Sequence, residues 1–138
     1  KCRSANSSII KYRYADVLLL KAEALIMQDT PDLDGAADII DEVRKRAKLG
    51  ALSASTRSNK NAMLNALLKE RRLELAFEGQ RWFDLVRLDK VEEVMNAVYS
   101  KDSGRKAQVY AFDKTSYRLP IPQSVIDAND KIHQNPGY

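Results

Sequence analysis

Three glutamates are the residues whose type and spacing could support chemistry. Glu70, Glu74 and Glu78 recur every fourth position within the segment 69–87, KERRLELAFEGQRWFDLVR. Side chains four positions apart lie on one face of an α-helix, because each residue turns the helix by about 100°. Carboxylates grouped in this way could serve acid–base catalysis or bind metal ions.

The residues around the three glutamates favour a structural role instead. Apolar residues fill the same face, so the carboxylates are expected to point into packing, where an unpaired charge is costly. This apolar set is Met63, Leu64, Leu67, Leu68, Leu73, Leu75 and Phe77. We therefore predict a structural network in which Glu70, Glu74 and Glu78 are paired with arginines. The cations nearest in sequence are Arg71, Arg81 and Arg87.

The catalytic alternatives have weaker support. A di-metal carboxylate bundle would use Glu-x-x-His pairs, but the sequence has none, and its single histidine, His133, lies near the C-terminus. A glycosidase carboxylate pair is conceivable, although these glutamates share one face and need cations to be tolerated there. Turnover of a polysaccharide that Glu74→Gln abolishes would support a hydrolase. We predict no enzyme activity, no metal site and no cofactor.

Composition places the chain among globular proteins. It has 138 residues, the length of one domain, with 44% hydrophobic and 30% charged residues. No apolar run approaches the roughly 18 residues of a membrane span, and no apolar leader precedes Cys2, the only cysteine. The net charge is +4, and the 23 basic residues are interleaved with 19 acidic ones. The basic cluster at 44–48 suits a helix C-terminus, so no nucleic-acid partner is expected.

Apolar periodicity predicts an all-α fold that begins with a helical hairpin. Two helices, 12–28 and 33–49, are separated by a break at Thr30-Pro31-Asp32, with Asp32 as an N-cap and Gly50 as a stop. The hairpin has about the length of one tetratricopeptide repeat. The first helix is apolar on nearly all sides, so we expect some of its packing partners to lie outside these residues.

The rest of the chain is predicted to be helical and then irregular. The expected elements are a loop at 51–61, a helix capped by Ser58 or Asn59 that runs to about 77, helices at 81–88 and 90–99, extended pieces at 108–112 and 117–119, and one helical turn at 124–128.

Four segments in this order resemble one known family. They are RYADVLLLKAEAL (13–25), VRKRA (43–47), ERRLELAFEGQRWFDLVR (70–87), and LPIPQSVIDAND with QNPGY (119–130, 134–138). Together they are similar to the C-terminal part of a SusD/RagB protein. The resemblance implies a non-catalytic outer-membrane lipoprotein on the surface of a Gram-negative bacterium. Such a protein binds glycans or other nutrients and works with a SusC-like TonB-dependent transporter.

The resemblance also implies how the chain is organised. Residues 1–138 correspond to the C-terminal part of a larger SusD-like α-helical fold, with a helical hairpin (12–49), motif helices (58–98), and a loop and tail (99–138). Family members are several times longer and carry a lipid on an N-terminal cysteine. Cys2 does not correspond to that cysteine, so membrane attachment would use an anchor absent from this chain.

Candidate glycan-binding residues are few. Sugars stack on exposed aromatic rings, and Tyr99 and Tyr110 flank the polar stretch after residue 100. Trp82 lies inside the helical motif and is expected in the core. A different class of function stays open. The hairpin and its very apolar first helix would also suit a helical-repeat adaptor that recognises another protein.

Overall fold

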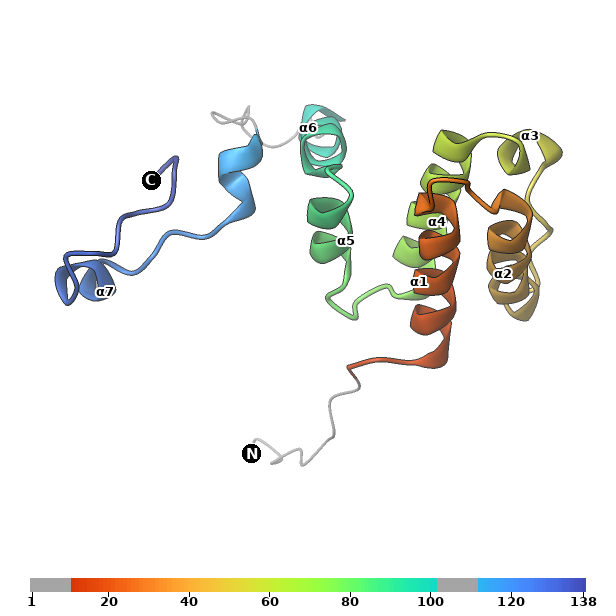
Figure 1. Cartoon of the computed structure of the whole chain (residues 1–138), viewed down its shortest axis with the longest axis horizontal. Helices are drawn as coiled ribbons and strands as arrows, with labels where there is room; N and C mark the ends of the chain where they lie inside the picture. Colours follow the sequence, from red (N-terminus) through yellow and green to blue (C-terminus); the bar gives the residue numbers. More distant parts are fainter. Residues whose placement is uncertain (1–10, 102–111) are drawn as a thin grey trace. The chain divides into compact units, whose positions relative to one another are not determined.

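The computed structural model describes residues 11–101 and 112–138 of this chain, and the regular structure in these ranges is helical (Figure 1). The elements are α1 (Tyr14–Met27), α2 (Leu33–Arg46), α3 (Ala54–Arg57), α4 (Lys60–Glu74), α5 (Arg81–Arg87), α6 (Val91–Lys101), the 3-10 helix η1 (Lys114–Tyr117) and α7 (Gln123–Asp127). The predicted all-α class is confirmed. The chain divides into two compact units, with the boundary between Arg81 and Trp82.

The first unit is built on the predicted helical hairpin. Helices α1 and α2 pack against each other and against α4, as Figure 1 shows. Ala22, Ala36 and Ala37 are wholly buried, and their small side chains let the helices approach closely. The core consists of Leu19, Ala22, Ile26, Ala36, Ala37, Ile40, Val43, Met63 and Leu67.

Side chains cap α2 and α4 where the sequence predicts. The Asp32 carboxylate accepts a hydrogen bond from the Gly35 amide at 2.9 Å, and the Asn59 side chain accepts one from the Ala62 amide at 2.9 Å. Each bond satisfies an amide that has no partner within its own helix.

The C-terminal end of α2 differs from the prediction. The helix ends at Arg46 rather than at Leu49, and Lys48 adopts a left-handed conformation with φ 58°. The Leu49 amide then donates to the Arg44 carbonyl at 2.9 Å. The chain therefore reverses at Lys48, two residues before Gly50, and closes the helix with the hydrogen bond of a Schellman-type end.

Helix α4 also ends earlier than predicted, at Glu74 rather than near Phe77. Phe77 takes a left-handed φ of 66° and its side chain is fully exposed, while Leu73 is 52% exposed. The expectation that Leu73 and Phe77 extend the apolar face of the helix is therefore wrong. A left-handed residue cannot continue a right-handed helix, so Phe77 and Glu78 lie in the turn that follows.

The predicted loop at 51–61 contains the short helix α3. Its N-cap is Ser53, whose hydroxyl accepts a hydrogen bond from the Thr56 amide at 3.3 Å. Arg57, the last residue of α3, forms ion pairs with Asp38 and Asp41 of α2. These contacts give order to a polar segment that has no apolar periodicity of its own.

The second unit contains the helices predicted after residue 80 and the tail. Leu85 and Val91 are its buried apolar side chains within the described residues. Tyr117, expected in an extended piece, ends the 3-10 helix η1 instead. The Gln134 side chain bonds both the amide and the carbonyl of Ile121, at 2.8 and 3.0 Å, and holds the tail around α7. The other extended piece, 108–112, lies outside the described residues except for Phe112.

In the part of the chain that the structure describes, no helix is both long enough and apolar enough to cross a membrane.

Candidate functional site

Glu70 is buried and paired across the helices. Its side chain is 4% exposed, and its Oε2 lies 3.0 Å from Nη1 of Arg44 on α2. The Arg44 Nε also donates to the Gly50 carbonyl at 2.8 Å. One guanidinium thus joins the end of α2 to the middle of α4. The sequence pattern indicated only a role at the α2 helix end for this arginine.

Glu74 lies between two arginines from separate segments. Its carboxylate is bound by Arg13, just before α1, and by Arg46, the last residue of α2. The Glu74 side chain is 8% exposed. The Arg13 Nε also binds Glu78 at 2.9 Å. Hydrogen bonds from Arg13 to Glu78 and then to Glu74 raise the pKa of the Arg13 guanidinium. Glu78 itself, with a 37% exposed side chain, lies nearer the surface than predicted.

The arginines nearest in sequence have other partners. Arg71 pairs with Asp16 of α1 at 2.9 Å, with side chains 2% and 4% exposed. Arg87 pairs with Asp84 at 2.9 Å, and Arg81 donates to the Leu68 carbonyl at 3.0 Å. Sequence proximity was a poor guide because helix packing, rather than chain distance, selects the partner. The signal that we missed was Asp16, a charged residue near the start of a mostly apolar helix.

Each of the three carboxylates forms an ion pair with at least one arginine from another segment of the chain. A groove nearby is lined by Arg13 and Arg46 but not by Glu70, Glu74 or Glu78. Within residues 11–101 and 112–138, no three His, Cys, Asp or Glu side chains are grouped to hold a metal ion.

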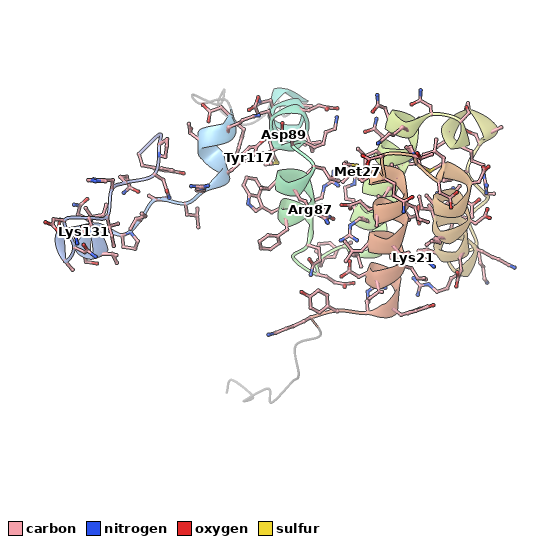
Figure 2. All side chains as sticks on the ribbon, viewed as in Figure 1. Lys21, Met27, Arg87, Asp89, Tyr117 and Lys131 are labelled. Atoms are coloured by element: carbon pink, nitrogen blue, oxygen red, sulfur yellow. The ribbon has the colours of Figure 1, made fainter. Side chains whose placement is uncertain are left out.

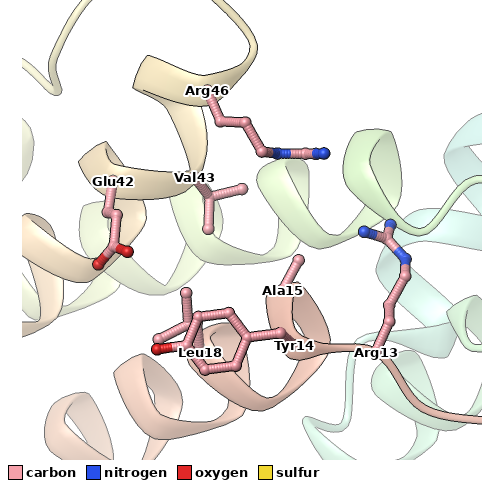
Figure 3. A pocket seen from close by; sticks show the side chains of 7 residues that line it. All are labelled: Arg13, Tyr14, Ala15, Leu18, Glu42, Val43 and Arg46. Atoms are coloured by element: carbon pink, nitrogen blue, oxygen red, sulfur yellow. The ribbon is translucent and has the colours of Figure 1, made fainter.

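The groove in the first unit lies between α1 and α2, and we call it the hairpin groove. Its volume is about 410 Å³. In Figure 3, Tyr14, Ala15 and Leu18 extend into it from α1, and Glu42, Val43 and Arg46 from α2, with Arg13 at one end. Tyr14 is 72% exposed. The groove is thus lined by apolar side chains together with the charged groups of Arg13, Glu42 and Arg46.

A second groove lies within the second unit, and we call it the aromatic groove. Its lining residues are Trp82, Phe83, Val86, Arg87 and Tyr117, and its volume is about 420 Å³. Trp82, expected in the core, lines this groove and packs edge-on against Phe112, with ring centroids 6.5 Å apart and an interplanar angle of 63°. Phe83 is 67% exposed.

Polar contacts fix Tyr117 at the edge of the aromatic groove. Its hydroxyl donates to Oδ1 of Asp89 at 3.0 Å; both residues are labelled in Figure 2. The Nζ of Lys114 lies 3.3 Å from Oδ2 of the same carboxylate. Burial and the bond to Asp89 raise the pKa of Tyr117. The hydrogen bond from Tyr117 and the nearby Lys114 lower the pKa of Asp89.

The two tyrosines predicted as glycan contacts are not assessed by this geometry. Tyr110 lies outside the described residues, and for Tyr99 the structure describes only the backbone, within α6. Neither groove was anticipated from the sequence. A run of aromatic residues next to an arginine, Arg81-Trp82-Phe83, was the available signal for the aromatic groove.

The helical hairpin, the short motif helices and the cross-helix ion pairs define an all-α scaffold. The chain belongs to the SusD family, whose family model matches residues 3–138. This agrees with the family expected from the four sequence segments.

Individual relatives are similar over much of the chain. SusD-like protein P2 of Formosa agariphila is 32% identical over 99% of this chain, and SusD-like protein P38 of the same organism is 39% identical over 67%. A crystal structure of a SusD-like protein from Bacteroides fragilis superposes with a TM-score of 0.73 and 28% identity over 94% of the chain. The chain spans only about a fifth to a quarter of these relatives: 27%, 19% and 26% of their lengths.

Proposed function

We propose that this chain is part of a nutrient-binding protein on the outer-membrane surface of a Gram-negative bacterium, directed at glycans. The protein works with a SusC-like TonB-dependent transporter and is held to the membrane by a lipid anchor outside these residues. The observation that carries the proposal is the SusD family match across residues 3–138. The grooves described above add surfaces on which a ligand could rest.

The proposed function involves no catalysis by these residues. Glu70, Glu74 and Glu78, the strongest candidates for acid–base chemistry, are occupied by arginines. A general acid or base must reach the proton that it transfers, and these carboxylates instead join α4 to α2 and to the start of α1. Incubation of the chain with polysaccharides should release no reducing sugar, and Glu74→Gln should leave that result unchanged.

Affinity electrophoresis of the chain through gels containing soluble polysaccharides tests the proposed function. We expect one or more polysaccharides to retard the chain relative to a gel without polysaccharide. Duplex DNA is the matched anionic control, since the net charge of +4 could attract any polyanion. Binding to DNA alone would contradict the proposal.

A second candidate function is recognition of another protein by the hairpin. It is favoured by exposed apolar side chains on α1: Tyr14, Val17 and Met27 are 72%, 53% and 52% exposed. A pull-down with the SusC-like transporter, compared with polysaccharide retardation of the same variant, distinguishes the two. If Val17→Glu abolishes capture of the transporter while polysaccharide retardation persists, the hairpin is an adaptor surface.

A further inference from the structure

The aromatic groove combines an apolar ring surface with one cationic side chain. Three of its five lining residues are aromatic, and Phe83 leaves much of its ring in contact with water. Exposed aromatic surface is costly to hydrate, and a ligand with an apolar face relieves that cost. The charged side chain of the lining is Arg87, which is 42% exposed and carries several hydrogen-bond donors beside the rings.

Two independent sets of contacts hold the groove in shape. On one side, Trp82 packs against Phe112, and the backbone of Phe112 makes hydrogen bonds in both directions with the Asn96 side chain, at 2.9 and 3.0 Å. On the other side, Tyr117 is held by Asp89. A site whose walls are fixed before binding loses less conformational entropy when the ligand arrives.

Arg87 is also held in place. Its Nη2 bonds Oδ1 of Asp84 at 2.9 Å, and the Asp84 side chain is only 4% exposed. A planar guanidinium presents several donors in a fixed plane. It can therefore meet adjacent hydroxyl groups on one edge of a ring while the aromatic side chains contact the face of that ring.

These features match a pyranose ring, which has an apolar face of C–H groups and an edge of hydroxyl groups. Stable protein–protein interfaces use roughly 20–30 residues from each partner. The five residues that line this groove would not form such an interface by themselves. A volume of about 420 Å³ lies within the range of small-ligand sites.

We propose that the aromatic groove is a carbohydrate-binding subsite that holds one sugar ring of a polysaccharide against Trp82 and Phe83, with Arg87 donating to its hydroxyl groups. This inference rests on the proposed function and adds a location for the ligand within this chain. It differs from the prediction from sequence, which pointed to Tyr99 and Tyr110.

The sequence provides a direct reporter for this subsite, because Trp82 is the only tryptophan. Intrinsic fluorescence therefore monitors the groove alone. The chain is titrated with amylopectin, xylan, galactomannan and polygalacturonate, and electrophoresis is run with the same four. We expect a saturable change in tryptophan emission with each polysaccharide that retards the chain, over the same concentration range.

Substitutions then separate the groove from the rest of the surface. Trp82→Ala should raise the Kd for the polysaccharide about tenfold or more, because one of the two rings proposed to contact the sugar is lost. Arg87→Lys keeps the charge and a partner for Asp84 but removes the planar donors, and should raise the Kd by about tenfold. Phe77→Ala is the control, since Phe77 is a fully exposed aromatic residue in the first unit, outside the groove. Helical content from circular dichroism verifies folding of each variant.

The outcomes distinguish this subsite from the proposed function. Retardation that persists in folded Trp82→Ala, or retardation without any change in tryptophan emission, overturns the subsite and leaves glycan binding intact. Tyr14→Ala then tests the hairpin groove. If none of the four polysaccharides changes either signal, the subsite is also overturned, and transporter pull-down decides the proposed function separately.

Discussion

Asp16 and Arg71 form an almost wholly buried ion pair between α1 and α4. Their side chains are 4% and 2% exposed and their charged atoms lie 2.9 Å apart. Removing one member leaves the other as an uncompensated buried charge, which costs far more than losing a surface pair. This pair and the arginines around Glu70 and Glu74 tie α1, α2 and α4 together.

Asp16→Ala should lower the free energy of unfolding by roughly 3–5 kcal/mol. Urea unfolding followed by circular dichroism measures the change. The matched control is Asp38→Ala, which removes an ion pair whose carboxylate side chain is 74% exposed and should change stability by about 0.5 kcal/mol or less. Equal effects of the two substitutions on the free energy of unfolding would contradict a larger contribution from the buried Asp16–Arg71 pair.

The contact between Asp89 and Tyr117 should depend on pH at both extremes. The pKa of Asp89 is lowered from 3.8, so its contribution is present above that value and is lost as the pH falls through the lowered pKa. The pKa of Tyr117 is raised from 10.0, so its contribution is complete below that value and is lost as the pH rises through the raised pKa. Between about pH 5 and about pH 9, the contact should be constant.

Titration of tyrosinate absorbance checks the alkaline limb. The chain has six tyrosines, and Tyr117 should ionise above its ordinary pKa of 10.0. Tyr117→Phe should remove this late component. Asp89→Asn should lower the pKa of Tyr117 only in part, because burial, the larger cause of the shift, remains. An unchanged late component in Tyr117→Phe would assign it to another residue.

At the scale of elements, helix ends were harder to predict than helix interiors. The starts of α2 and α4 were predicted correctly because Asp32 and Asn59 cap them through local hydrogen bonds. The ends at Arg46 and Glu74 were predicted too late. The left-handed residues that follow them are Lys48 and Phe77, whereas the sequence pattern for a helix end relies on a glycine at that place. Apolar periodicity therefore predicts the existence of a helix more reliably than the residue at which the helix ends.

Close packing within the hairpin depends on alanine. Ala37→Leu inserts a larger side chain at a wholly buried position of α2 and should destabilise the chain by about 1–3 kcal/mol. Ala24→Leu is the matched control on α1, at an exposed position, and should change stability by about 0.5 kcal/mol or less. Thermal unfolding of both variants measures the difference. If Ala37→Leu is tolerated as well as Ala24→Leu, the helices are not in tight contact at this position.

At the scale of the whole molecule, buried apolar surface is unevenly divided between the two units. In the described residues, the first unit contains the nine-residue core together with buried Leu68 and Leu75, whereas the second contains Leu85 and Val91. Hydrophobic burial is the main favourable term in folding. We therefore expect the second unit to be the less stable of the two.

Hydrogen exchange read out by mass spectrometry tests this expectation. Amides of α1, α2 and α4 should exchange slowly, and amides of α5 and α6 should exchange faster, because regions with few buried apolar contacts open more often. Saturation with a polysaccharide that binds the aromatic groove should slow exchange in α5 more than in α2. Equal protection of α2 and α5 in the free chain would contradict the expected order of stability.

The sequence by itself determined the all-α class, the helical hairpin and the SusD family. These follow from local patterns: apolar periodicity, side-chain caps and motif segments that need no knowledge of distant contacts. Tertiary structure decided which arginine pairs with which carboxylate and where Trp82 lies, because those contacts join residues far apart in the chain. Glu74 meets Arg13 and Arg46 rather than Arg71, since helix packing brings the start of α1 and the end of α2 to the end of α4.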